Sequence, residues 1–244
     1  MTGAEPWPPA PADRIMAAVL GVIDMRRGPR MKRDPLPVVT LSWARSAAGA
    51  IAREDGKPLL LSGRESMMLT HRLRAAHDAI LVGIQTVLND DPLLSVRLLP
   101  GPPPFPQPQP VVLDSRLRFP TGARLLARED RKPWIFHAPE AGAAAAAALK
   151  EKGARLFQVS RVPGGLDLHE TLMKLGAAGI SSLMVEGGAR VLRAFLAAGF
   201  ADQLVVTMSP STVQGMRGPD MPGCVESLTE AHGADSVTWG TLNP

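Results

Sequence analysis

The sequence predicts an α/β fold in which a largely parallel sheet is flanked by helices. Short apolar or β-branched segments alternate with amphipathic or alanine-rich segments from residue 79 to residue 209, a pattern typical of a parallel sheet covered on both faces. Polar residues and glycines follow two of the apolar segments, and ligands in open α/β sheets lie beyond the carboxyl ends of strands. The chain has 244 residues, 45% of them hydrophobic, so we expect one domain with a large core.

Charge and cysteine content argue against several classes of function. The 27 basic and 23 acidic residues are interleaved, so no nucleic-acid-binding stripe is indicated. A single cysteine, Cys224, provides neither a disulfide framework nor a thiolate zinc site, and the five histidines show no metal-ligand spacing. No apolar run is long enough to span a bilayer. We therefore expect a cytoplasmic protein without a metal that binds neither membrane nor nucleic acid.

The first 37 residues are expected to form a proline-rich and basic arm, followed by one folded domain over residues 38–244. The arm begins near EPWPPAPAD and ends with RRGPRMKRD. Its basic end suits a solvated linker better than a targeting or nucleic-acid-binding tag. The apolar segment at 15–23 is short, and we expect an isolated helical turn or two there.

The domain begins with two expected strands on either side of an expected helix. Residues 38–44 (VVTLSWA) are rich in β-branched side chains and predict a strand, and residues 45–57 follow as a glycine-containing loop. Residues 66–76 place apolar side chains at helical spacing. Residues 79–84 (AILVGI) form a continuous apolar run, as in strands that are buried on both faces.

Further strands and helices alternate towards the end of the chain. Residues 99–110 (LPGPPPFPQPQP) predict a proline-rich loop. Short apolar runs predict strands at 111–114, 133–137, 155–159, 182–185, 203–208 and 236–240. Alanine-rich or amphipathic segments predict helices at 141–152, 168–175 and 189–198.

Residues 85–97 (QTVLNDDPLLSVR) are the first stretch with the chemistry of a binding site. They leave an apolar strand and pass two aspartates and a proline before Arg97. Their place after a core strand favours contact with a ligand. An ordinary capped turn at Asp90-Asp91-Pro92 accounts for the same residues equally well.

Glu186, Gly187 and Gly188 form the second such stretch, between the strand at 182–185 and the helix at 189–198. Two glycines let the backbone approach a ligand closely, and the N–H groups of the next helical turn suit an anion such as phosphate. The three spaced glycines of a Rossmann turn are absent, so a plain tight connection is the alternative. Glu186 ends an apolar strand and needs a partner, either a ligand hydroxyl or a basic side chain.

Five segments resemble a known family in their order and spacing. They are VVTLSWARS, LTHRLRAAHDAILVG, TVLNDDPLLSVR, VVLDSRLRFP and MVEGGARV. The chain resembles the fungal-type 2,5-diamino-6-ribosylamino-4(3H)-pyrimidinone 5′-phosphate reductases of riboflavin biosynthesis, and it is similar to the reductase half of bacterial bifunctional deaminase/reductases. The resemblance implies a dihydrofolate reductase-like mixed sheet, a homodimer, and hydride transfer from NADPH to C1′ of a ribosylamino sugar.

The resemblance also implies roles for individual residues. NADPH would be bound by Thr86, Asp90, Leu166, Gly187, Gly188, Ala189, Arg190 and Val191. The substrate, a pyrimidine ribosyl phosphate, would be bound by Arg74, Leu94, Arg97 and Glu186, with the arginines on its phosphate and Glu186 on a sugar hydroxyl. Ser115 and Arg116 are a further hypothesis, for the 2′-phosphate of NADPH. No catalytic residue is assigned, because the cofactor carries out the hydride transfer.

Structural alternatives to these roles stay open. Arg74 is also spaced to pair with Asp78 one turn on, and Arg97 is also compatible with a solvated loop. Relatives carry an aspartate and a basic residue where this chain has residues 47–50 (AAGA), and they commonly continue into a last valine-rich strand, so an edge of the sheet is expected to be missing. The zinc deaminase activity of the bifunctional relatives is not expected, because its motif needs more than one cysteine.

Three functions stay open, and the altered loop at 47–50 is the reason to consider a related pterin or pyrimidine as the substrate. The first is reduction of the aminated pyrimidine. The second is reduction of the deaminated pyrimidine or of a related pterin or pyrimidine. The third is a non-catalytic role as a nucleotide-binding paralogue.

Overall fold

The structure is a computed structural model that describes residues 13–27, 36–55, 59–101 and 104–242. Its strands are β1 Val38–Ser46, β2 Ala50–Ala52, β3 Ala79–Gly83, β4 Gln109–Leu113, β5 Trp134–His137, β6 Arg155–Gln158, β7 Arg161–Val162, β8 Gly165–Leu166, β9 Ser182–Val185, β10 Gln203–Ser209, β11 Met216–Arg217, β12 Ser227–His232 and β13 Asp235–Thr241. Its helices are α1 Arg14–Arg27, α2 Arg64–Ala76, α3 Ile84–Asp90, α4 Arg124–Ala127, α5 Ala143–Glu151, α6 Leu168–Ala177 and α7 Ala189–Ala197.

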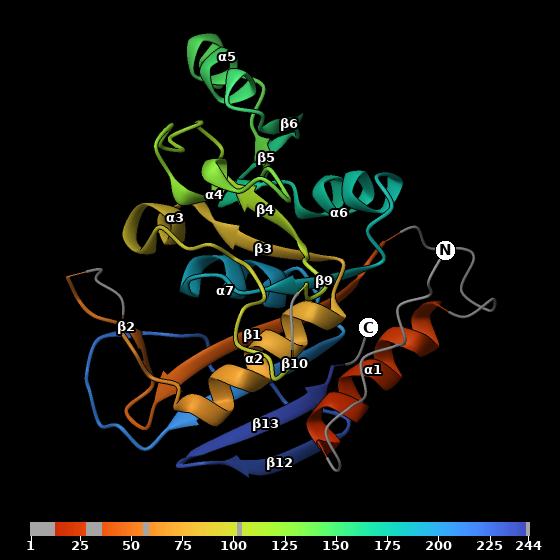
Figure 1. Cartoon of the computed structure of the whole chain (residues 1–244), viewed down its shortest axis with the longest axis vertical. Helices are drawn as coiled ribbons and strands as arrows, with labels where there is room; N and C mark the ends of the chain where they lie inside the picture. The colour runs from red at the N-terminus through yellow and green to blue at the C-terminus, as the bar shows by residue number, and fades with distance from the viewer. Residues whose placement is uncertain (1–12, 28–35, 56–58, 102–103, 243–244) are drawn as a thin grey trace.

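Within these ranges nine strands form one sheet in the order β12-β13-β10-β1-β9-β3-β4-β5-β6 (Figure 1). The strands from β10 to β6 pair in parallel, whereas β13 is antiparallel to both β10 and β12. The predicted fold class, a mixed and largely parallel sheet flanked by helices, is confirmed. The strand expected at residues 236–240 is β13, which pairs with β10 on one side and with β12 on the other.

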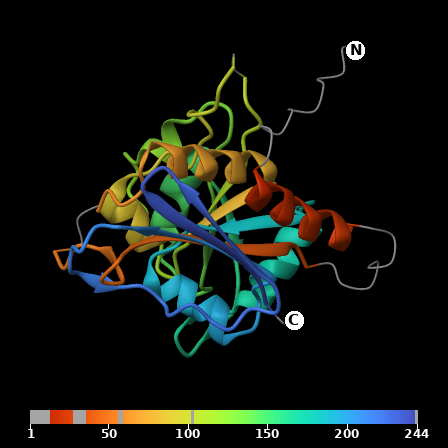
Figure 2. The same ribbon diagram turned by 90° about the horizontal axis from the view of Figure 1, so that it is seen from below.

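Helices cover both faces of the sheet, as alternating side chains of buried strands require. On one face α6 and α7 pack against the central strands through a cluster that includes Leu172, Leu192 and Phe195. On the opposite face α1 and α2 cover β1, β9, β10 and β13, and α3, α4 and α5 cover β3 to β5. Figure 2 shows α1 and α2 on one side of the sheet and α7 on the other.

Every strand and helix that we predicted between residues 38 and 244 is present, with ends that differ by up to two residues. The expected loop at 45–57 instead contains the end of β1 and the strand β2, which pairs with the distant β11. The stretch at 85–97, for which no helix was predicted, begins as α3, because Ile84 and Val87 lie one turn apart and are both buried against the sheet. Local periodicity does not reveal a strand such as β2 that pairs with a distant segment. It also gives little sign of a helix such as α3 that buries only two side chains.

The prediction of an arm is wrong for residues 14–27, because α1 belongs to the folded domain. Ile15, Val19 and Ile23 recur at helical spacing and are at most 1% exposed, packed against β1, β10 and β13. The side chain of Gln203 in β10 donates to the backbone oxygen of Val19 at 3.3 Å and accepts from the indole of Trp239 at 2.8 Å. The remainder of the predicted arm, at 1–12 and 28–35, lies outside the described residues.

We predict that Ile23→Ala lowers the free energy of unfolding by about 2–5 kcal/mol, because it leaves a cavity between α1 and the sheet. Met25→Ala is the matched control, since Met25 lies on the same helix and is 72% exposed. It should change stability by no more than about 0.5 kcal/mol. Urea unfolding of the two variants measures the difference, and equal effects would mean that α1 contributes nothing to the core.

Candidate active site

The two predicted ligand-binding stretches meet at the carboxyl ends of β3 and β9. These strands are parallel neighbours, and the N–H of Glu186 continues the pairing with a 2.9 Å bond to the backbone oxygen of Leu81. β3 leads into α3, and β9 leads through Gly187 and Gly188 into α7 (Figure 1). Both helices therefore start at the same edge of the sheet, where ligands bind in open α/β folds.

Glycines let the starts of α3 and α7 approach each other. A Cβ at Gly83 or Gly187 would lie 2.8 Å from side-chain atoms of Val191, so tight packing accounts for glycine at these two positions. A Cβ at Gly188 would meet only Thr86 Oγ1, at 3.8 Å, which is ordinary contact. Gly188 is the N-cap of α7, and in the described chain no side chain caps it. Packing therefore explains Gly187, whereas Gly188 adjoins N–H groups that are available to a ligand.

The other predicted cofactor residues lie on α3, α7 and β8. Thr86 and Asp90 are four residues apart in α3 and share one face of it. Arg190, in the first turn of α7, donates to the backbone oxygen of Gly164 at 2.8 Å. Gly164 lies in the turn between β7 and β8, and β8 carries the buried Leu166. The structure thus brings Leu166 close to α7, a contact that the sequence alone does not predict.

Arg74 and Glu186, both predicted substrate residues, form a bidentate ion pair. Arg74 Nε and Nη2 lie 2.7 and 2.6 Å from the two carboxylate oxygens, and the side chains are only 12% and 16% exposed. Burial by itself would lower the pKa of Arg74, but the Glu186 carboxylate raises it. Asp78 was the alternative partner considered for Arg74. Its carboxylate accepts hydrogen bonds from the backbone N–H groups of Ser181 and Ser182, each at 2.9 Å. Glu186 thus has the basic partner that its position at a strand end demanded.

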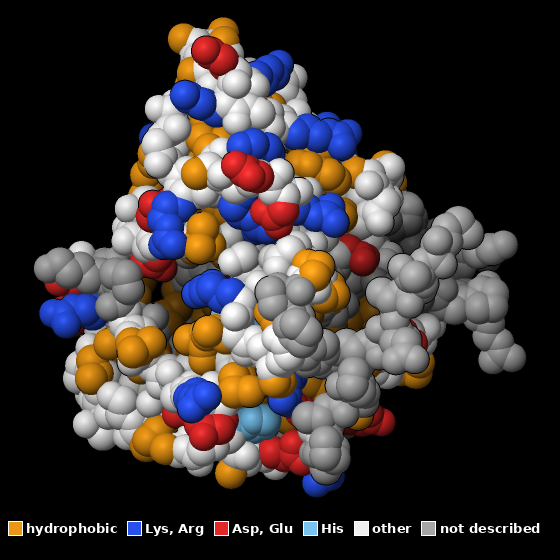
Figure 3. Space-filling view, viewed as in Figure 1, with side chains coloured by type: hydrophobic (Ala, Val, Ile, Leu, Met, Phe, Trp, Pro, Cys, Tyr) orange, Lys and Arg blue, Asp and Glu red, His pale blue; other side chains and the backbone are white. Residues whose placement is uncertain are grey.

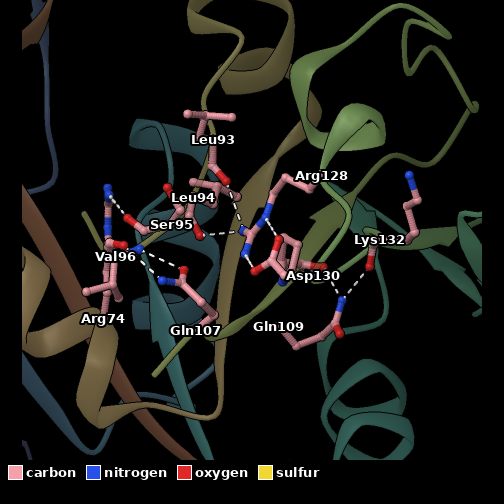
Figure 4. A network of polar contacts seen from close by, with 11 residues as sticks. Arg74, Leu93, Leu94, Ser95, Val96, Gln107, Gln109, Arg128, Asp130 and Lys132 are labelled. Atoms are coloured by element: carbon pink, nitrogen blue, oxygen red, sulfur yellow. Dashed lines mark hydrogen bonds and ion pairs between the residues drawn. The ribbon is translucent and has the colours of Figure 1, made fainter. Parts of the chain in front are cut away.

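The segment at 93–97 has no regular secondary structure and is held by side chains (Figure 4). Arg128 donates to the backbone oxygens of Leu93 and Leu94, both at 3.0 Å, and Arg74 donates to that of Ser95 at 3.2 Å. Leu94 has a φ of 45°, a conformation that costs a non-glycine residue free energy and needs such support.

Two more side chains complete this support. The amide of Gln107 bonds to both the N–H and the oxygen of Val96, at 3.0 and 2.9 Å. Nδ1 of the wholly buried His71 accepts the N–H of Arg97 at 3.2 Å. Four side chains from other parts of the chain therefore fix the backbone from Leu93 to Arg97.

Three arginines and one carboxylate determine the charge of this region. Partial burial lowers the pKa of Arg97, the nearby charges of Arg74 and Arg124 act in the same direction, and Glu186 acts against them. Figure 3 shows lysine and arginine side chains spread over the upper half of the molecule and a hollow at its left edge. Around Arg97 the three positive charges of the arginines outnumber the one negative charge of Glu186, and this excess favours an anionic ligand.

His71, Arg124 and Arg128 are site residues that sequence reasoning missed. His71 precedes Arg74 by one helical turn, which is the only local signal. Arg124 and Arg128 lie in a stretch without a motif, and only the fold brings them to Arg97 and Leu94.

Ser115 and Arg116, predicted for a 2′-phosphate, follow β4 and so lie at the same edge of the sheet as the turn after β3. Their turn is organised by the fully buried Asp114, whose Oδ2 accepts the N–H of Phe119 at 2.8 Å. Burial raises the pKa of Asp114, and backbone N–H bonds partly offset this. Arg116 is exposed.

The altered loop at 47–50 is a tight turn beside an arginine from elsewhere in the chain. Gly49 has a φ of 86°, and a Cβ there would lie 3.3 Å from the guanidinium of Arg217. Arg217 is paired with Ala50 across β2 and β11. The guanidinium of Arg217 therefore adjoins this loop.

Asp13, Glu230 and His232 bring three possible metal-ligand atoms within 4.8 Å of one another, a grouping that histidine spacing did not predict. Both carboxylates have other partners. Asp13 bonds to Arg72 at 2.9 Å and to the N–H of Met16 at 3.0 Å, and Glu230 lies 3.7 Å from Arg14. We assign no metal to this group.

Comparison with known proteins gives the family. The family model described as the RibD C-terminal domain matches residues 37–237. The chain belongs to this family. The match confirms the resemblance drawn from the five sequence segments, and α1 lies before the matched region.

Members of the RibD C-terminal domain family resemble this chain over most of its length. A 2,5-diamino-6-ribosylamino-4(3H)-pyrimidinone 5′-phosphate reductase from Methanothermobacter thermautotrophicus is 36% identical over 179 residues, which are 73% of this chain and 80% of the relative. Riboflavin biosynthesis protein RibD of Aquifex aeolicus is 37% identical over 174 residues, 71% of this chain and 46% of the relative. The chain thus spans about half the length of the RibD relatives that it matches.

Solved structures share the fold. RibD of Acinetobacter baumannii has a TM-score of 0.76 at 24% identity and covers 92% of this chain and 62% of its own. The riboflavin biosynthesis reductase Rib7 of Saccharomyces cerevisiae has a TM-score of 0.71 at 23% identity and covers 92% of this chain and 99% of its own. The predicted mixed, largely parallel sheet flanked by helices is thus the fold that these RibD and Rib7 structures share. In the described ranges, no helix has the length and apolar character needed to cross a bilayer.

We predict that His71 makes stability depend on pH below neutrality. Burial lowers its pKa to about 4, the charges of Arg74 and Arg97 act in the same direction, and Glu186 opposes them. Because an unfolded histidine has a pKa of about 6.5, the unfolded state binds the extra proton between these values. The free energy of unfolding should therefore fall as pH is lowered from 6.5 to 4, by at most about 1.4 kcal/mol per unit from this residue.

Urea unfolding of the wild type and of His71→Asn between pH 7 and pH 4 measures this dependence. The variant should lose less stability on acidification than the wild type does. Parallel curves for the two proteins would contradict the assignment of a neutral, buried imidazole.

Proposed function

We propose that this chain is an NADPH-dependent reductase of riboflavin biosynthesis. It would convert the ribosylamino side chain of 2,5-diamino-6-ribosylamino-4(3H)-pyrimidinone 5′-phosphate to ribitylamino. Family membership supports the proposal, as do the names of its relatives. The strongest structural support is that the uncapped start of α7 at Gly188 and the cluster of arginines around Glu186 lie at the same edge of the sheet. A cofactor phosphate and a substrate phosphate would then bind at separate sites at one edge of the sheet.

The residues around α7 fit the phosphates of NADPH, which supplies the hydride when it is bound. Uncapped N–H groups at the start of a helix suit an anion, and the absence of a side chain at Gly188 gives access to them. The pyrophosphate would lie on the turn from Gly187 to Val191, with Thr86 on the facing helix. Asp90, Leu166 and Arg190 would line the rest of the cofactor site, and Arg116 would receive the 2′-phosphate.

The residues around Arg74 would bind and orient the substrate. Arg74 uses three of its five N–H groups on Glu186 and Ser95, which leaves two for a phosphate oxygen. Arg97 would bind the same phosphate from the fixed loop, and Leu94 would contact the sugar. Glu186 would accept a bond from a sugar hydroxyl with its remaining lone pairs. Because the protein mainly positions two molecules, no acid–base triad is required.

A second candidate substrate is the deaminated pyrimidine. A structural neighbour from Thermotoga maritima, 23% identical to this chain, is named as a deaminase and 5-amino-6-(5-phosphoribosylamino)uracil reductase. The homodimer and the cytoplasmic location that the resemblance implies remain predictions.

Oxidation of NADPH, followed by absorbance, tests the proposal with the aminated and the deaminated pyrimidine offered separately. We expect oxidation with the aminated substrate and little with the deaminated one. Arg97→Met should raise KM about 10- to 100-fold, because it removes a charge-assisted bond to the phosphate. The exposed Arg131→Met is the matched control and should leave KM unchanged.

The reverse substrate preference would favour the deaminated pyrimidine. Bound NADPH without oxidation on either substrate would contradict the reductase proposal and favour a nucleotide-binding paralogue. Normal turnover would also show that Ala47 to Ala50, with Arg217 beside them, are compatible with activity.

A further inference from the structure

His71 is a fully buried side chain beside the arginine cluster with no role in the function proposed so far. It lies on α2 one turn before Arg74, so the two side chains leave the same face of the helix. Its Nδ1 accepts the N–H of Arg97 at 3.2 Å. Its Nε2 is buried and has no hydrogen-bond partner among the described residues.

The bond to Arg97 determines which nitrogen carries the proton. A nitrogen that accepts a hydrogen bond is unprotonated, so in the neutral imidazole the proton is on Nε2. His71 is neutral near pH 7, since burial and the two neighbouring arginines disfavour its charged form. Nε2–H is therefore a buried donor without an acceptor, and native proteins rarely leave such a donor unpaired unless a water or a ligand binds it.

The surroundings of His71 indicate what kind of acceptor this is. Charged groups act on it from its own helix, through Arg74, from the loop, through Arg97, and from the end of β9, through Glu186. Two cations and one carboxylate give the site a net positive charge, which favours an anion. An anion held by the two arginines also offers oxygen acceptors to a neutral donor beside them.

We propose that His71 is a third phosphate-binding residue, whose Nε2–H donates to a 5′-phosphate oxygen held by Arg74 and Arg97. The identity of the ligand as a sugar phosphate rests on the proposed function. The imidazole has two simultaneous roles, since Nδ1 positions the backbone of Arg97 and Nε2 binds the anion. As a neutral group it adds a hydrogen bond without adding repulsion between positive charges.

Two substitutions separate these roles. In His71→Asn the amide oxygen takes the place of Nδ1 and keeps the bond to Arg97, but no donor reaches the position of Nε2. In His71→Gln the amide nitrogen reaches the position of Nε2. His169→Asn is the matched control, because His169 is exposed on α6, away from this cluster.

The test is an NMR titration of the full chain with ribose 5-phosphate and with ribose, which follows millimolar binding. The wild type should bind ribose 5-phosphate more tightly. His71→Asn should weaken this binding about 10- to 100-fold and leave ribose binding unchanged, as expected for the loss of one bond to a charged group. His71→Gln should restore part of the affinity, and His169→Asn should have no effect. Unchanged NADPH binding in each variant shows that the fold is intact.

Three results would overturn the proposal. An equal loss for ribose 5-phosphate and ribose would mean that His71 only supports the loop. Unchanged affinity in His71→Asn would mean that Nε2–H does not contact the phosphate. A wild type without preference for ribose 5-phosphate would mean that no phosphate binds there. Because the experiment measures binding, it tests the role of His71 whether or not the protein oxidises NADPH.

Discussion

The ion pair between Arg74 and Glu186 is the interaction on which the site depends. It joins α2 to the end of β9, two elements 112 residues apart in the chain. Breaking a buried pair by removing one partner costs about 3–5 kcal/mol, because the other charge is left uncompensated. The pair therefore holds the last turn of α2 against the strand end that leads to the glycine turn. The proposed substrate and cofactor sites share this fixed point.

The loop that carries Leu94 and Arg97 is held in place by side chains from other parts of the chain. Its backbone groups bond to side chains instead of to a neighbouring strand, and Arg128 and Gln107 supply most of these bonds. Binding sites require positions that are correct to a fraction of an ångström, and ordering a loop at the moment of binding weakens affinity. A loop that is already ordered avoids this cost and presents Arg97 in one place.

The strands and the glycine turn were predictable because they follow from local patterns. A continuous apolar run marks β3, and the interruption of an apolar strand by Glu186 and two glycines marks the start of α7. Only an isolated helical turn or two was predicted where the structure has α1, because the apolar side chains of this helix form a core only when they pack against β10 and β13. His71, Arg124 and Arg128 were missed because fold contacts, and not sequence spacing, bring them to the site. The family resemblance supplied the roles of the individual binding residues, and these roles remain proposals.

The proposed hydride transfer from NADPH to C1′ can be followed with labelled cofactor. NADPH that carries deuterium at C4, first on one face of the ring and then on the other, is incubated with the protein and the aminated pyrimidine. Mass spectrometry then locates the label in the ribitylamino product. A rigid site that holds both molecules in one orientation predicts deuterium at C1′ from one face only. Product without deuterium from either label, or with equal amounts from both, would contradict this mechanism.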